Sequence, residues 1–127
     1  MIVDVHTHSP THADTVPADE MRTYSGWHDG DPVQTTNSFA DYAKGMEAAD
    51  ISIVFNIHVP DTERLVGTPG DANRINEDTA DFVKQDNRRI GFMSVDPNRH
   101  DWQEEMDKSL GLGLVGIKLG ANYQRFE

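Results

Sequence analysis

Two histidines separated by a single residue, His6 and His8, stand in the segment VDVHTH near the start of the chain. Because side chains alternate along a strand, Asp4, His6 and His8 are expected on one face of it. Neutral imidazole is the commonest side-chain ligand of zinc and similar metals. The pattern therefore predicts that His6 and His8 bind a divalent metal ion, with zinc preferred. The alternative is an ordinary polar start to a loop.

Lys118 is the next candidate, because two histidines do not complete a catalytic zinc site. It lies in LVGIKLG, where alternating apolar residues are expected to pack beneath helices: Val115, Ile117 and Leu119. Lys118 would then point inward, which is costly unless the charge is paired or used chemically. It is a candidate for binding an anionic substrate or, once carbamylated, for bridging two metal ions. The alternative is an ammonium that reaches out of the strand end to a carboxylate.

Three other residues are expected to contact the substrate. His58 follows an apolar run in FNIHVP, where it shares a face with Asn56 and would look into a site at the strand end; a loop histidine is the alternative. Arg22 and Trp27 lie in a segment over 9–35 that is rich in Pro, Asp, Thr and Gly. Loops of that length are usually functional or disordered. This one is expected to cover the site and set its specificity, unless it is a flexible insertion.

The elements that must position these residues alternate along the chain. Short apolar runs predict strands over 2–5, 51–57, 90–95 and 114–119. Between them, apolar residues repeat at helical spacing in segments that begin at Ser38, near Asp71 and at Asp101. Capping-box spacing is present at the first and the last of these starts, in the pairs Ser38/Asp41 and Asp101/Glu104. The last helix is expected to bury a stripe of three residues and to stop at Gly111: Trp102, Met106 and Leu110.

This alternation predicts an α/β fold with a parallel sheet and right-handed crossovers. A doubly wound sheet would place its site where the strand order reverses. A (β/α)8 barrel would place it at the carboxyl ends of the strands, but typically needs about 250 residues. With 127 residues, the chain would be the N-terminal half of such a barrel: one partial domain over 1–127 with the insertion at 9–35. The run GLGLVG at 111–116 is no dinucleotide fingerprint, because it precedes a strand instead of opening a helix.

Composition narrows the classes of partner. The chain is 36% apolar and 26% charged, which is typical of a soluble globular domain. A net charge of −11 disfavours nucleic acid and anionic membrane surfaces as partners. It says little about the small-molecule substrate that is the expected partner, because a buried site sets its own local field. The absence of cysteine excludes disulfides and thiolate metal sites. No signal-peptide pattern precedes the first strand, so that a cytoplasmic location is expected.

Three segments taken together resemble the amidohydrolase superfamily, in the group of aminocarboxymuconate-semialdehyde decarboxylase-like enzymes: VDVHTH, DANRINEDTADFVKQDNRRIGFMSVDPN and GLVGIKLG. The resemblance covers the chain outside 9–35 and implies the first four strands of a (β/α)8 TIM barrel with one or two divalent metals. It implies that His6 and His8 are ligands from the first strand. It places Lys118 where binuclear members carry a carbamylated lysine. The remaining ligands and the acid–base groups are implied to lie beyond residue 127.

The function that this resemblance implies is metal-dependent hydrolysis of a lactone, amide or related bond by a metal-activated water. Non-oxidative decarboxylation by the same family is the alternative. An alternative of another class is a catalytically incomplete half-barrel fragment, whose open sheet edges would favour homo-oligomers. A metal-dependent phosphoesterase of the polymerase-and-histidinol-phosphatase type ranks third, because the chain has Asn-Ile-His where that type carries Thr-Asp-His.

Overall fold

The computed structural model describes residues 1–10, 39–56, 72–120 and 124, and the chain divides into two compact units. One unit spans Pro10–Glu47 and contributes one described helix, α2 (Phe39–Gly45), at the position predicted after Ser38. The other unit joins Met1–Ser9 to Ala48–Glu127 and carries the sheet. No helix in the described part of the chain is long and apolar enough to cross a membrane.

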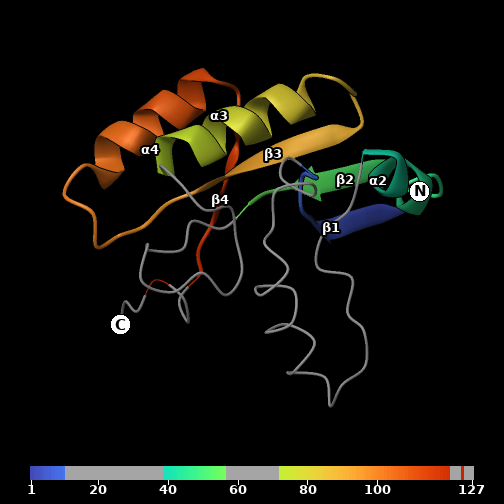
Figure 1. Cartoon of the computed structure of the whole chain (residues 1–127), viewed down its shortest axis with the longest axis horizontal. Helices are drawn as coiled ribbons and strands as arrows, with labels where there is room; N and C mark the ends of the chain where they lie inside the picture. The colour runs from blue at the N-terminus through green and yellow to red at the C-terminus, as the bar shows by residue number, and fades with distance from the viewer. Residues whose placement is uncertain (11–38, 57–71, 121–123, 125–127) are drawn as a thin grey trace, which may run out of the picture. The chain divides into compact units, whose positions relative to one another are not determined.

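Four parallel strands form the sheet of the larger unit (Figure 1): β1 (Val3–Thr7), β2 (Ile51–Val54), β3 (Arg89–Ser94) and β4 (Gly116–Lys118). Their order in space follows their order in the chain, and each neighbouring pair runs parallel. The predicted α/β class with a parallel sheet is therefore confirmed. A doubly wound sheet reverses its strand order at a switch point, and the described strands contain no such reversal.

Helices α3 (Ala72–Val83) and α4 (Trp102–Gly111) lie side by side over one face of the sheet (Figure 1). The core between them and the sheet has four buried residues with three partly buried ones packed against them: Ala80, Met93, Val95 and Leu114, then Trp102, Met106 and Leu112. Burying an apolar side chain of this size contributes about 1.5–3 kcal/mol. On the opposite face, Phe55 is buried against Ile53 and Phe92. We call this second surface the Phe55 face.

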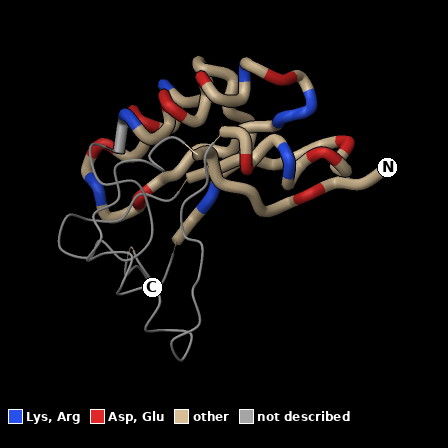
Figure 2. The backbone as a smooth tube through the Cα atoms, turned by 45° about the vertical axis from the view of Figure 1, so that its right-hand side comes forward, with Lys and Arg blue, Asp and Glu red and all other residues tan. Residues whose placement is uncertain are grey.

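Charged residues of both signs run along the two helices (Figure 2). One ion pair joins the helices, with Nζ of Lys108 on α4 lying 2.8 Å from Oε1 of Glu77 on α3. Both side chains are more than two-fifths exposed, at 44% and 47%. Exposed ion pairs of this kind contribute about 0–1 kcal/mol. The helix layer is therefore held mainly by its apolar contacts and by the buried polar groups described next.

The buried side of α4 differs from its predicted apolar stripe. Leu110 is 52% exposed, whereas Glu105 and Ser109 are buried. The reason is a set of hydrogen bonds to the carboxylate: Nδ2 of Asn76 donates to Oε1 of Glu105 at 2.8 Å, and the Ser109 hydroxyl donates to the same oxygen at 3.2 Å. Because these polar groups satisfy one another, they can occupy the interior in place of a leucine.

The ends of α4 also differ from the prediction. Asp101 makes no side-chain hydrogen bond to the start of the helix, so that the expected capping box with Glu104 is wrong. Its carboxylate pairs instead with Arg99, at 2.6 Å from Nη2 to Oδ2, and this charge-assisted bond takes the oxygens that a cap would use. The helix stops at Gly111 as predicted, and the left-handed backbone that follows is at Gly113, with φ of +96°.

The two edge strands carry apolar side chains that are not covered. Residues 2–5 are the apolar run predicted to form the first strand, a pattern typical of a buried strand, yet Val3 and Val5 are 40% and 65% exposed. The three residues of the last strand segment that were expected to pack beneath helices are exposed as well: Val115, Ile117 and Leu119. Both results have one reason, because β1 and β4 are the edges of the described sheet while the helix α3 packs on β3.

Candidate metal site

Three side chains from the two edge strands meet around one aromatic ring. His6 lies in β1, His8 follows it, and Lys118 ends β4. The ring centroids of His6 and His8 lie 4.9 and 5.0 Å from the centroid of the Phe55 ring. Nζ of Lys118 lies over the same ring, 4.5 Å from its centroid. The structure therefore brings the three predicted metal candidates together on the Phe55 face.

The end of β1 is fixed against β2 by the residue between the two histidines. Thr7 is buried, its hydroxyl donates to the carbonyl of Ile53 at 2.9 Å, and its own carbonyl accepts the N–H of Phe55 at 3.0 Å. The pairing of β1 with β2 shifts register just before this point. With Thr7 held in this way, the imidazoles on either side of it both reach the Phe55 ring.

The two imidazoles lie close to each other and differ in their surroundings. Their centroids are 5.4 Å apart, with the ring planes tilted by 60°. His8 keeps an exposed edge, but removal of water from the rest of the ring lowers its pKa to about 4, and the charges of His6 and Lys118 act in the same direction. A hydrogen bond with the backbone of Phe55 opposes this shift. At neutral pH, His8 is therefore the neutral imidazole that a metal ion requires.

The ammonium of Lys118 contacts an aromatic ring, whereas a lysine ammonium usually pairs with a carboxylate. Within the described residues, the Lys118 side chain contacts the Phe55 ring, and no described carboxylate lies within ion-pair distance of its ammonium. Among the described residues, the alternative in which its ammonium leaves the strand end to meet a carboxylate finds no partner. Its position along β4 is set by pairing with Ser94 on β3.

These donors fit part of a metal site. Two histidines at alternate positions of one strand supply two nitrogen ligands. Across the described ranges, no group of three His, Cys, Asp or Glu side chains is placed to hold an ion. The third neighbour is Lys118, whose ammonium repels a cation and whose carbamate would attract one. His6 and His8 therefore fit two ligand positions of a metal site, which would need further ligands to be complete.

Asn76 is a buried positioning residue that sequence reasoning missed. It is fully buried on α3, its Nδ2 donates to the carbonyl of Ser94 at 3.0 Å, and its Oδ1 accepts the Ser94 N–H at 2.7 Å. Since Ser94 pairs with Lys118, Asn76 anchors the strand end beside the candidate site. The sequence does contain a signal for this role. Asn76 follows Ile75 on the apolar side of the helix, where a buried amide without hydrogen bonds would be costly.

Asn56 does not face the candidate site. Its Nδ2 donates to Oγ1 of Thr79 on α3 at 3.0 Å and to Oγ of Ser9 at 2.7 Å, on the helix side of the sheet. The expectation that Asn56 looks into the site is wrong, because these two hydroxyls satisfy the amide on the other face. The three predicted substrate contacts lie outside the described residues: His58, Trp27 and Arg22.

The glycine-rich run at 111–116 follows α4 and leads into β4, which is the inverse of a dinucleotide-binding context, as predicted. Comparisons of the chain with protein-family models, with curated proteins and with solved structures found no match. A function for this chain is therefore argued from the arrangement of its own residues.

Proposed function

We propose that the protein is a metal-dependent hydrolase of the amidohydrolase type, acting on a lactone, amide or related bond. The observation that carries the proposal is the meeting of His6, His8 and Lys118 around Phe55 on one face of a parallel sheet. All three lie at the carboxyl ends of their strands. That end of a parallel β/α sheet is where such enzymes build their active sites.

In this proposal the sheet is the first half of a (β/α)8 TIM barrel. Two features support it: the strands follow one another in sequential order, and α3 and α4 share one face. A closed barrel also accounts for the apolar exposure of the edge strands, including Val5 at 65% and Val115 at 68%. In a barrel each edge gains a neighbouring strand and each outer face a covering helix.

Each of the site residues has a distinct role in the proposed reaction. His6 and His8 would hold a divalent ion, with zinc the best match to neutral imidazole nitrogen. When bound, such an ion supplies a Lewis acid that polarises a carbonyl and lowers the pKa of a water molecule. Addition of CO2 to the neutral amine of Lys118, with loss of one proton, would give an anionic carbamate that attracts metal. Phe55 would shield one side of the group from water.

Non-oxidative decarboxylation is the second candidate, and one observation favours it. As an ammonium, Lys118 stands near His8 with no described carboxylate beside it. A cation beside the two histidines that has no carboxylate partner among the described residues suits a substrate that carries its own carboxylate. The same protein fold would then bind an acid and release CO2 from it.

Activity of the zinc-loaded protein from the complete reading frame tests both candidates. We expect hydrolysis of some members of a panel of lactones and N-acyl amides, and loss of that activity in His6→Ala and His8→Ala. Release of CO2 from aromatic or unsaturated acids, with the same dependence on the two histidines, would favour decarboxylation instead. Equal activity of the parent and the histidine variants in every assay would refute the proposal.

A further inference from the structure

We infer that Phe55 is the positioning residue of this site: its ring sets where His6, His8 and Lys118 stand relative to one another. The part of this inference that concerns metal rests on the proposed function. The part that concerns the placement of the three side chains rests on the contacts alone.

The three groups all contact the Phe55 ring. The imidazole of His8 meets it at 77° and that of His6 at 60°, both in the edge-to-face arrangement that aromatic pairs prefer. The ammonium of Lys118 lies over the ring, where the negative face of the π system attracts a cation. The side chain is only 3% exposed, so that little of the ring faces water.

Phe55 is the shared contact of groups that come from opposite edges of the sheet. The histidines belong to the β1 side and Lys118 to β4, with β2 and β3 between them. Within the described residues, neither histidine makes a hydrogen bond to the Lys118 side chain, and both meet it through the Phe55 ring. The relative placement of the three groups therefore depends on where this ring stands.

The ring is itself held in place from below. Ile53 and Phe92 pack against it, and its backbone N–H bonds to Thr7. The Phe92 ring lies so close to Gly116 that a Cβ there would come within 2.5 Å of it. Glycine at 116 thus leaves room for an apolar side chain at 92, and Ile53 and the backbone bond to Thr7 hold Phe55 without depending on the Phe92 ring. A fixed ring is what a positioning role requires.

Phe92 also offers a matched control. It is an aromatic residue of the same face and cluster. Within the described part of the chain it lies against Phe55 and Gly116, whereas the ring contacts of His6, His8 and Lys118 are with Phe55. Phe55→Leu and Phe92→Leu remove the same atoms from the same apolar layer. Only the first removes the surface on which the histidines and Lys118 rest. A purely structural role would make the two variants behave alike.

The first measurement is made without metal on the full chain. Three-bond NMR couplings report the χ1 rotamers of His6 and His8. We expect single rotamers in the parent and in Phe92→Leu, and averaged couplings in Phe55→Leu. Single rotamers in Phe55→Leu would overturn the inference. Should Phe55→Leu fail to fold by circular dichroism, Phe55→Met replaces it, because the flexible thioether chain fills the volume of the ring without its aromatic face.

The second measurement titrates the same proteins with Co²⁺, whose visible spectrum reports ligand geometry. We expect Phe55→Leu to bind roughly 10–100-fold more weakly than the parent with an altered spectrum, as for other changes behind metal ligands. Phe92→Leu should keep the parent spectrum. Parent-like affinity and spectrum in Phe55→Leu would overturn the positioning role. A parent that binds no Co²⁺ would refute the proposed function, and the rotamer comparison would still decide whether Phe55 positions the three groups.

Discussion

The ammonium of Lys118 lies 4.5 Å from the centroid of the Phe55 ring, although β3 stands between β4 and the strand that leads to Phe55. Neighbouring strands are about 4.8 Å apart, so that this contact spans about two strand spacings. A long side chain is needed to bridge them. Lys118 therefore extends across the Phe55 face toward the two histidines instead of leaving the sheet at its own strand end.

Asn76 should be the most sensitive polar position in the described core. Asn76→Ala removes the side-chain partner of both backbone groups of Ser94 and one of the two donors to Oε1 of Glu105. Buried polar groups that lose a partner cost about 1–3 kcal/mol each, and we expect the free energy of unfolding to fall by about 3 kcal/mol in urea denaturation. Asn87→Ala, at an exposed position, should change it by less than about 0.5 kcal/mol. Equal losses in the two variants would contradict the role of Asn76.

A side chain at Gly91 should lower the stability of the protein. A Cβ there would lie 2.4 Å from Cδ2 of Leu114 and 3.1 Å from Cγ2 of Val83, where β3 meets α3. Overpacking of this kind costs about 1–3 kcal/mol, so that the melting temperature of Gly91→Ala should fall. Gly111 at the end of α4 has nothing within 4 Å of the same added atom. Gly111→Ala should therefore leave the melting temperature unchanged or raise it, through the lower entropy of the unfolded chain. A reversed order of the two variants would show that the packing at Gly91 is misassigned.

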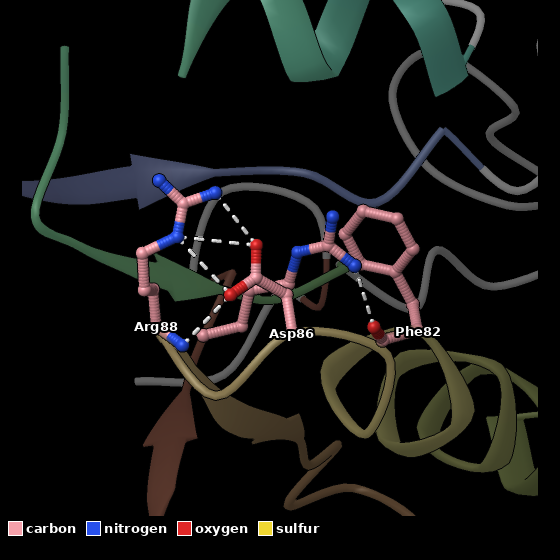
Figure 3. A network of polar contacts seen from close by, with 4 residues as sticks. Phe82, Asp86 and Arg88 are labelled. Atoms are coloured by element: carbon pink, nitrogen blue, oxygen red, sulfur yellow. Dashed lines mark hydrogen bonds and ion pairs between the residues drawn. The ribbon is translucent and has the colours of Figure 1, made fainter. Parts of the chain in front are cut away.

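Asp86 should titrate far below an ordinary aspartate. The Arg88 side chain bonds its carboxylate, with Nη2–Oδ2 at 2.8 Å (Figure 3), and the Arg88 N–H adds another bond. Together they lower its pKa to about 2 from 3.8. In Arg88→Ala, carbon-detected NMR should find the Asp86 pKa closer to 3.8. Asp101, which is paired with Arg99, is the internal control and should keep its pKa of about 2.

The same pair fixes the sign of a pH effect on stability. A carboxyl group with a lowered pKa in the folded state stabilises the fold above its unfolded pKa and loses that contribution as the pH falls through the folded value. The difference in the free energy of unfolding between the parent and Arg88→Ala should therefore be largest above pH 3.8 and decrease as the pH falls toward 2. The pair is exposed to solvent, so that the difference should also weaken in salt. A difference that grows on acidification would contradict this assignment.

The fold class and the proximity of the site residues could be predicted because both follow from patterns between neighbouring residues. Alternation along a strand depends only on neighbouring residues, so that VDVHTH and LVGIKLG reveal which side chains share a face. Parallel strands then bring their carboxyl ends to one edge of the sheet. His6, His8 and Lys118 could be placed together by these two rules. The barrel and the reaction remain proposals, because they depend on more than the described strands.

The rest of the site depends on contacts between distant residues. Glu105 is buried in preference to Leu110 because Asn76, on another helix, donates a hydrogen bond to it, and no periodicity within α4 contains that information. Phe55 ends the run ISIVF, whose last three residues are all apolar and therefore do not indicate which of them faces the site. Asn56 was assigned to the wrong face for the same reason, since its partners Thr79 and Ser9 are remote in sequence.

The most direct test of the central claim is the zinc affinity of the purified chain, measured by equilibrium dialysis and metal analysis. Metal-free parent protein should take up zinc, and His6→Ala and His8→Ala should each bind it at least about tenfold more weakly, because each removes one of two adjacent nitrogen ligands. His100→Ala, which removes an exposed histidine beside α4, is the matched control and should bind zinc as the parent does. Zinc uptake by His6→Ala and His8→Ala that equals that of the parent would contradict the account.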